Sequence, residues 1–264
     1  MLIVGELINS TRKSIAKAIE EKDGEYLRNL ASQQVEAGAH YIDINSAEAA
    51  DELATMKWLI DLIQDAVDVP LCLDSPNPQV IQECIGLCRK TPMINSISAE
   101  PDRWEQVLPI VRQYKTKVIA LCMDEKGIPN STEERLRIAD RLVLGLTEEG
   151  VPEDDIYLDP LIKPIGVNSS YGAEILETIW ALRHKYPNVH IISGLSNISY
   201  GLPERKLVNR VFMVMSVAMG MDSFILDPLN QQNMSELITA QMVGGHDKNC
   251  RNYLSSVRKG RILA

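Results

Sequence analysis

The sequence predicts an α/β fold, a (β/α)8 TIM barrel, and three observations support it. Eight short runs rich in β-branched and aliphatic residues alternate with longer segments of helical periodicity. Successive runs start 23 to 39 residues apart, which leaves room for the crossover helix that parallel strands require. The length of 264 residues fits the roughly 250 typical of such barrels. An open doubly wound sheet would carry a G-x-G-x-x-G turn after its first strand, and Gly5–Ser10 does not.

The predicted strands are spread along the whole chain. In order they are Leu2–Ile8, His40–Asn45, Pro70–Ser75, Met93–Ser98, Lys117–Met123, Ile156–Pro160, His190–Ser196 and Ser223–Pro228.

Helix signals occupy the gaps between these strands. Glu48–Val67 carries an apolar stripe at helical spacing, and Ser131 stands three residues before a glutamate, as in a capping box. Gly38 and Gly150 follow helical runs, where a glycine commonly ends a helix. Arg205–Gly220 is apolar nearly all round in its second half, so we expect a well-buried helix there.

The chain shows no linker or low-complexity tract, so we expect one domain over residues 1–264. Its end, Arg251–Ala264, is consistent with either a short extra helix or a frayed tail. The formal net charge of −9 argues against a nucleic-acid partner, which usually needs a basic face. Five scattered cysteines and the lack of a signal or membrane-spanning stretch favour a reduced, cytoplasmic protein without a membrane partner.

Polar side chains stand at or beside the end of seven of the eight predicted strands. Parallel barrel strands bring their carboxyl ends to one mouth, where barrel enzymes place their active sites. Alternate residues of a strand face opposite sides. Asp43 and Asn45 therefore share one face of their strand, and Cys72 and Asp74 share one face of theirs. Each residue alone is as compatible with capping the next helix. The polar strand-end residues are Glu6, Asp43, Asn45, Asp74, Ser75, Asn95, Ser96, Asp159, Ser196, Asn197 and Asp227.

These strand ends combine carboxylates and amides with almost no cations. Such a set suits a neutral polar heterocycle with several N–H donors, whereas a phosphate ligand would call for lysine, arginine or glycine-flanked helix starts. We predict no metal site, because no cysteine–histidine pair has ligand spacing on one element and the four histidines are scattered.

Several motifs together resemble the pterin-binding methyltransferases, in particular the methyltetrahydrofolate:corrinoid protein methyltransferases. The resemblance extends from Met1 to about residue 245. The matching stretches are GELIN at Gly5–Asn9, DIN at Asp43–Asn45, CLDS at Cys72–Ser75, MINS at Met93–Ser96, DPLI at Asp159–Ile162, GLSNIS at Gly194–Ser199, and the segment Arg205 to Arg210.

The resemblance implies a barrel that binds tetrahydrofolate or 5-methyltetrahydrofolate as substrate, and a separate corrinoid protein that carries the cobalamin. It implies a homodimer as well. It assigns Asn197 to N5 of the pterin, the nitrogen that carries the methyl group, and Arg205 to the p-aminobenzoate and glutamate end. The pterin ring would be held by Asp74, Asn95 and Asp159 and lined by Gly194 and Ser196. Further candidates for the site are Glu6, Asn9, Asp43, Asn45, Tyr200 and Lys163.

Two alternatives stay open at this point. A dihydropteroate synthase-like enzyme would hold the pterin ring with the same residues. It should also carry cations at the seventh and eighth strands, and Ser223–Pro228 has none. A non-catalytic folate-binding barrel would need only the residues that hold the pterin ring. Asn197 could also serve simply as a turn residue, since asparagine is favoured in turns. The direction of methyl transfer is not encoded in the motifs.

Overall fold

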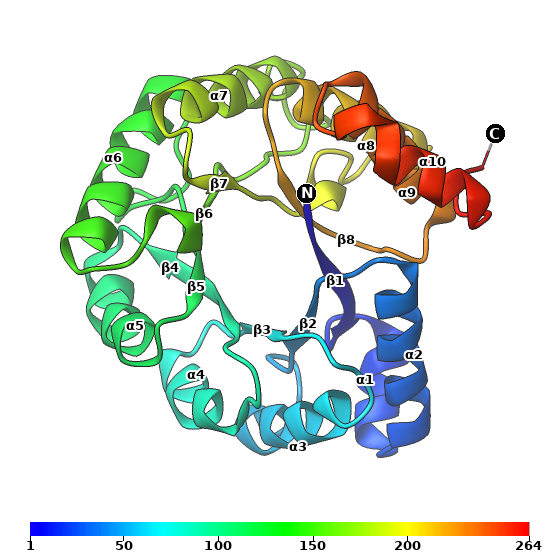
Figure 1. Cartoon of the computed structure of the whole chain (residues 1–264). Helices are drawn as coiled ribbons and strands as arrows, with labels where there is room; N and C mark the ends of the chain where they lie inside the picture. The colour runs from blue at the N-terminus through cyan, green and yellow to red at the C-terminus, as the bar shows by residue number, and fades with distance from the viewer. Residues whose placement is uncertain (264) are drawn as a thin grey trace.

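The computed structural model describes residues 1–263, so the last residue of the predicted domain and tail lies outside the described residues. Within them, eight strands form one parallel sheet in the order β7-β6-β5-β4-β3-β2-β1-β8. An isolated parallel bridge from Gly194 to Ile225 joins the two ends of the sheet. The result is a (β/α)8 TIM barrel ringed by helices, as Figure 1 shows, and it confirms the predicted fold.

The bounds of the strands and helices follow the predicted order. The strands are β1 Leu2–Asn9, β2 Tyr41–Asn45, β3 Leu71–Asp74, β4 Met93–Ser98, β5 Lys117–Leu121, β6 Ile156–Asp159, β7 His190–Ile191 and β8 Ser223–Leu226. The α-helices are α1 Lys13–Glu20, α2 Gly24–Ala37, α3 Glu52–Gln64, α4 Pro78–Cys84, α5 Pro101–Tyr114, α6 Thr132–Glu148, α7 Tyr171–Lys185, α8 Arg205–Ala218, α9 Gln231–Val243 and α10 Arg251–Arg258. Short 3-10 turns are η1 Ile85–Leu87, η2 Glu153–Asp155, η3 Leu195–Asn197 and η4 Lys248–Cys250.

Local signals set several of these bounds. The Ser131 hydroxyl accepts from Glu134 N at 3.2 Å and starts α6, while Gly38 ends α2 with φ +116°. The predicted helix over Glu48–Val67 is shorter, because the Asp51 carboxylate accepts from Ala54 N and so places the start of α3 at Glu52. The open choice at the C-terminus resolves as a helix, α10.

Two predictions about elements were wrong. The seventh strand has two residues rather than seven, because Leu195–Asn197 form a 3-10 turn in place of extended chain. Helix α8 is not fully buried: its exposed stripe runs along one face at helical spacing. The stripe consists of Leu207, Val211, Val214 and Met215, which are 39–54% exposed.

The core has two layers, as the parity of the strands predicts. Aliphatic residues such as Ile42, Ile44 and Leu73 pack outward against the helices. Inside the barrel a separate cluster fills the half nearest the strand starts. Its buried members are Val4, Tyr41, Cys72, Met93, Ile119, Tyr157 and Ile192. On most of these strands, the inward-facing side chain two residues further along is polar.

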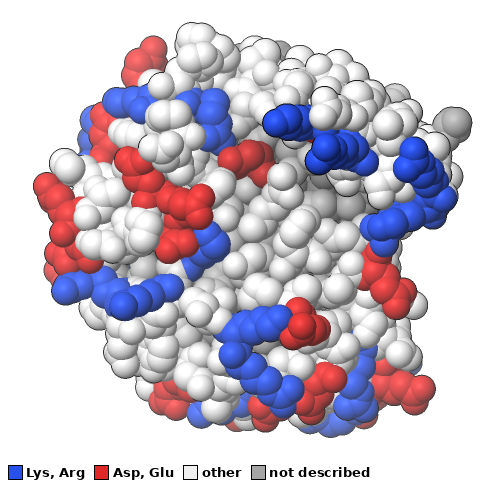
Figure 2. All heavy atoms as spheres, in the orientation of Figure 1, with Lys and Arg blue, Asp and Glu red and all other residues white. Residues whose placement is uncertain are grey.

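The face shown in Figures 1 and 2 holds the N-terminus near its centre. Figure 2 shows acidic and basic side chains interspersed around the periphery of this face, with basic ones over the region of α10 and a largely uncharged centre. In residues 1–263, none of the helices is both long and apolar enough to cross a membrane.

Candidate functional site

A cavity of about 620 Å³ opens at the carboxyl ends of β1–β4 and β8. Its walls come from these strand ends, from η3 and from the first turns of α8 and α9. The structure thus brings together seven of the predicted site residues. They are Glu6, Asn9, Asp43, Asp74, Asn95, Ser196 and Arg205.

A bulge in β1 directs two of these side chains into the same cavity. The pairing of β1 with β2 shifts between Gly5 and Ile8, so Glu6 and Asn9 both line the cavity although they are three residues apart. Buried Gln34 stabilises the bulge, because its Oε1 accepts from Leu7 N at 3.1 Å. Gly5 allows this approach: a Cβ there would stand 2.5 Å from Gln34 Oε1.

Strand register places four polar residues in one row across the mouth. Asn9 pairs with Asn45, Asn45 with Asp74, and Asp74 with Asn95. Asn45 is buried and does not line the cavity; its Nδ2 donates to Asp74 Oδ2 at 2.8 Å. Its Oδ1 accepts from Ala47 N at 3.0 Å. Asn45 therefore orients Asp74 rather than facing the cavity itself.

The surroundings of three carboxyl groups at the mouth shift their pKa values upward. Burial raises the pKa of Asp43 well above its ordinary value, and neighbouring Asp74 raises it further. Burial also raises the pKa of Asp74, against the hydrogen bond from Asn45 and the charge of Arg103. The pKa of Glu6 is raised by burial as well, although the charge of Arg12 opposes the shift.

Asp159 lies at the end of β6, which β5 separates from Asn95 on β4. Its Oδ1 accepts from Leu161 N and from Ser193 Oγ, each at 2.8 Å. Burial raises the pKa of Asp159 to about 6, and the hydrogen bonds from Leu161 and Ser193 oppose the shift. Asp159 is 7% exposed and is not part of the cavity lining.

Asn197 closes the turn η3 above Gly194. Its backbone N–H donates to Gly194 O at 3.4 Å, and its side-chain Nδ2 lies 3.4 Å from where a Cβ on Gly194 would stand. Within residues 1–263 the side-chain amide of Asn197 has no hydrogen-bond partner, and it is exposed. The amide is therefore free for a ligand, and the turn forms without it.

The expectation of a mouth with almost no cations was wrong. Arg12, Arg205 and Lys206 all line the cavity. Arg12 pairs with Glu6 at 2.7 Å, and Arg205 donates to Ser196 O at 2.8 Å and to Ser199 Oγ at 3.1 Å. Arg12 and Lys206 were missed because they lie in a loop and a helix, beyond the strand ends that parity identifies.

Two other predicted residues lie on the rim, outside the cavity lining. Tyr200 is 68% exposed, with the Arg205 guanidinium 5.9 Å from its ring centre. Lys163 donates to Asn130 Oδ1 at 3.0 Å and lies 4.5 Å from the ring centre of Tyr171.

Three buried oxygens beside the cavity lack a hydrogen-bond partner among the described residues. They are Asp43 Oδ1, Asn209 Oδ1 and Asn233 Oδ1, and each belongs to a residue of the cavity wall. A buried acceptor without a donor is costly, so the cavity has capacity for a ligand rich in N–H groups. Asn209 and Asn233 were not predicted because both come from helices.

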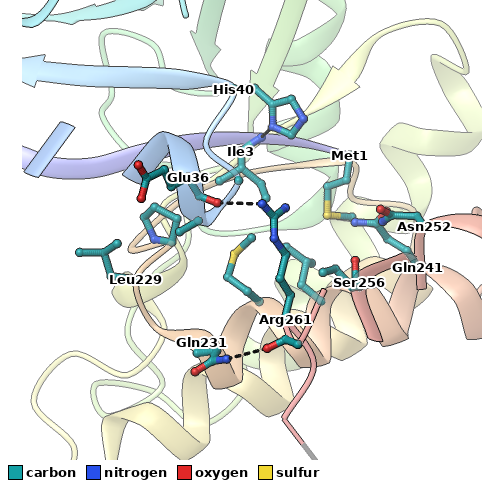
Figure 3. A pocket seen from close by; sticks show the side chains of 17 residues that line it. Met1, Ile3, Glu36, His40, Leu229, Gln231, Gln241, Asn252, Ser256 and Arg261 are labelled. Carbon is teal, nitrogen blue, oxygen red and sulfur yellow. Dashed lines mark hydrogen bonds between the residues drawn. The ribbon is translucent and has the colours of Figure 1, made fainter. Parts of the chain in front are cut away.

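A second cavity, of about 610 Å³, lies at the opposite end of the barrel, where the strands start (Figure 3). Arg261 donates to the backbone oxygen of Glu36 at 3.2 Å, and Gln231 donates to that of Gly260 at 3.4 Å. Figure 3 labels Arg261, Glu36 and Gln231 around the cavity. The predicted site residues all lie elsewhere. Among residues 1–263, no group of three or more His, Cys, Asp or Glu side chains is arranged to hold a metal ion.

The sequence of the chain matches a family of known proteins. The pterin binding enzyme model matches residues 5–227. The methylcorrinoid:tetrahydrofolate methyltransferase of Eubacterium limosum is 36% identical over 99% of this chain and 98% of its own length. The methionine synthase of Mycobacterium tuberculosis is 30% identical over 86% of this chain, which spans 20% of that larger protein.

Solved structures match the fold. Dihydropteroate synthase from Yersinia pestis superposes with a TM-score of 0.67 at 16% identity, covering 95% of this chain and 94% of that chain. The Coxiella burnetii dihydropteroate synthase bound to pteroic acid gives 0.65 at 17% identity, covering 94% and 93%. At these identities the likeness concerns the barrel alone. The family model and the full-length relative together show that this chain belongs to the pterin-binding enzymes.

Proposed function

We propose that this protein transfers a methyl group between N5 of tetrahydrofolate and the cobalt of a corrinoid carried by a separate protein. The observation that carries the proposal is the row of polar strand ends above the barrel core, with three buried acceptor oxygens left without donors. The relative from Eubacterium limosum, alike over its full length, is named for this reaction. We propose the direction of that name, from methylcorrinoid to tetrahydrofolate.

The pterin ring is proposed to lie over the row of strand ends, with its N–H groups donating to Asp74, Asn95 and Asp159. Gly194 and Ser196 would line the ring, and the free amide of Asn197 would face N5. Glu6, Asn9 and Asp43 line the same cavity and would complete its polar wall, while Asn45 would hold Asp74. This agrees with the excess of acceptors in the cavity.

Arg205 is proposed to face the p-aminobenzoate and glutamate end of the folate. It lies at the start of α8 on the cavity wall, and the Tyr200 ring stands close to its guanidinium. Negative carboxylates at that end would suit the cations Arg205 and Lys206. The neutral pterin would occupy the deeper part between the strand ends.

The chemistry of this chain would centre on N5. The corrinoid of the partner protein supplies the exchangeable methyl group. The chain's own residues bind the pterin, exclude water from it and place N5 at the open side of the mouth. An amide such as Asn197 can hydrogen-bond N5 without adding a charge, and a bond that strengthens toward the transition state accelerates the reaction.

The corrinoid protein is proposed to dock over the rim, where Tyr200 and Lys163 stand outside the cavity. Residues 1–264 are proposed to act as one domain, in the cytoplasm, where the free thiols of all five cysteines would persist.

We also propose a homodimer formed through α7 and α8. The exposed apolar stripe of α8 borders a groove of about 480 Å³ whose lining is almost entirely apolar and includes Ala173 and Leu176 of α7. Trp180, one turn beyond Leu176, is 50% exposed. A second copy covering this surface would remove it from water.

The decisive experiment mixes the protein with tetrahydrofolate and methylcobalamin. We expect 5-methyltetrahydrofolate to form while the corrinoid spectrum changes in equal amount, with mass spectrometry identifying the product. Folate binding without transfer, even with methylated corrinoid proteins, would favour a folate-binding barrel. Formation of dihydropteroate from p-aminobenzoate and a pterin pyrophosphate would favour a dihydropteroate synthase-like enzyme.

A further inference from the structure

Arg103 lies outside the cavity lining, on the first turn of α5, yet it contacts the backbone of the loop that follows β3 and the backbone of β4 itself. Its Nε donates to Ser96 O at 2.8 Å. Its two terminal nitrogens donate to Pro76 O at 2.8 Å and to Ser75 O at 3.0 Å. One planar guanidinium therefore bridges the chain immediately after β3 to the chain within β4.

Two of these carbonyls belong to residues next to the side chains proposed to hold the pterin. Ser75 directly follows Asp74, and Ser96 directly follows Asn95. The two side chains already share a register, since Asp74 pairs with Asn95 across β3 and β4. Holding Ser75 O and Ser96 O on one rigid fork fixes the distance and angle between the two side chains.

Arg103 brings charge as well as geometry. Asp74 is faced by Asp43 on β2, Glu52 on α3 and Cys72 on its own strand, and Asn45 donates to it. Against those acidic neighbours, Arg103 is the cation whose field lowers the pKa of Asp74. An ionised Asp74 accepts hydrogen bonds with both oxygens, whereas a protonated one has less capacity for N–H donors.

We infer that Arg103 is a positioning residue for substrate: from behind β3 and β4 it holds Asp74 and Asn95 in one geometry and keeps Asp74 an acceptor for the N–H donors of the pterin. This inference rests on the proposed function for the identity of the ligand. It makes a separate statement about this chain, namely that Arg103 controls the ionisation of Asp74 with or without ligand.

Three variants separate the two contributions. Arg103→Lys keeps the charge but loses the planar fork, Arg103→Gln keeps short hydrogen-bonding groups but loses the charge, and Arg103→Met loses both. The matched control is Arg89→Gln. Arg89 likewise donates to a backbone carbonyl, Gln64 O at 3.1 Å, and pairs with Asp65, but it lies where the strands start.

The first measurement is the affinity for 5-methyltetrahydrofolate between pH 5 and pH 8, by calorimetry. We expect Arg103→Gln to weaken binding about tenfold at pH 7 and to move the loss of affinity in acid to higher pH. The direction follows because removing the cation raises the pKa of Asp74. Arg103→Lys should weaken binding with its pH profile unmoved, Arg103→Met should match or exceed Arg103→Gln, and Arg89→Gln should behave like wild type.

The second measurement needs no ligand. The Asp74 carboxyl is titrated by carbon NMR in labelled protein, its signal identified from its loss in Asp74→Asn. We expect a higher pKa in Arg103→Gln than in wild type and an unchanged one in Arg89→Gln. Wild-type affinity and an unmoved titration in Arg103→Gln would overturn the inference.

The outcomes distinguish the two proposals. If wild type fails to bind folate while Arg103→Gln still moves the Asp74 titration, the proposed function fails and the role of Arg103 stands. If Arg103→Gln does not fold, as judged by circular dichroism, the folded Arg103→Lys decides. Weaker folate binding by Arg103→Lys with an unchanged kcat would support a positioning role for Arg103. Folate binding by Arg103→Lys at the wild-type affinity would refute that role.

Discussion

Ser193 Oγ donates a 2.8 Å hydrogen bond to Asp159 Oδ1, and both residues are buried at the mouth of the barrel. Ser193 follows the two-residue strand β7, and its own carbonyl accepts from Ile225 N at 3.0 Å. The contact thus ties a carboxylate at the end of β6 to the segment that closes the barrel. Asp159 would be costly to ionise there without it.

Because Asp159 is buried, we predict that removing its charge stabilises the fold and weakens folate binding. Because its pKa is raised to about 6, its protonated form is favoured in the folded state, and stability falls as pH rises from about 4 through 6. Asp159→Asn retains an oxygen for Leu161 and Ser193 without a charge. We expect it to raise the free energy of unfolding at pH 8 by up to roughly 3 kcal/mol and to weaken folate binding.

Urea unfolding at pH 8 and pH 4 checks this, with the exposed Asp68→Asn as control. The gain should vanish at pH 4, where Asp159 is already protonated in the folded protein. An equal gain at both pH values would show that charge is not the cause, and a loss at pH 8 would contradict the prediction.

The free amide of Asn197 predicts a kinetic effect. Asn197→Ala should lower the single-turnover rate of methyl transfer by roughly 100-fold, as for loss of one preorganised hydrogen bond, while folate affinity falls less. Asn197→Asp should retain more activity than Asn197→Ala at neutral pH, because an ionised carboxylate can accept a hydrogen bond from N5–H as N5 takes the methyl group and gains positive charge. Stopped-flow measurement on variants with native circular dichroism tests both. A well-folded Asn197→Ala at the wild-type rate would leave Asn197 a turn residue.

Docking of the corrinoid protein over the rim predicts that a rim substitution slows methyl transfer from a protein-bound corrinoid more than transfer from free methylcobalamin. Tyr200→Ala should slow transfer with a methylated corrinoid protein roughly fivefold, since exposed aromatic side chains often anchor interfaces. Transfer from free methylcobalamin should change far less. Tyr26→Ala, a half-exposed tyrosine on α2, is the control. Gly201 is a poorer site for such a test, because its φ of +80° strains any side chain placed there. Equal slowing of both reactions by Tyr200→Ala would argue against docking at this rim.

The apolar surface of α7 and α8 predicts the oligomeric state. Sedimentation should show a dimer for wild type and a monomer for Val211→Glu, since a carboxylate in that interface would lose its water. Leu144→Glu alters an equally exposed apolar residue on α6 and should remain dimeric. A monomeric wild type, or a dimeric Val211→Glu, would remove this surface from consideration.

Strand parity determined much of the site from sequence alone. Alternation along a strand and the shared direction of parallel strands leave little freedom, so Asp43, Asp74 and Asn95 had to meet at one mouth. The same logic placed the aliphatic face against the helices, as Ile42 and Leu73 show. The motifs around these residues resembled the pterin-binding family, and the family model and the full-length relative confirm that resemblance.

Tertiary structure decided what parity cannot. Glu6 and Asn9 share the cavity because Gln34, from a helix, holds a bulge in β1. The cations of the mouth and Arg103 behind it come from loops and helices, whose side chains have no fixed phase relative to the strands. Asn45, predicted to face the cavity, was instead assigned to Asp74 by its hydrogen bond. Contacts between segments that are far apart in the sequence decide these arrangements. The residues around a given position do not show which distant side chain will be its partner.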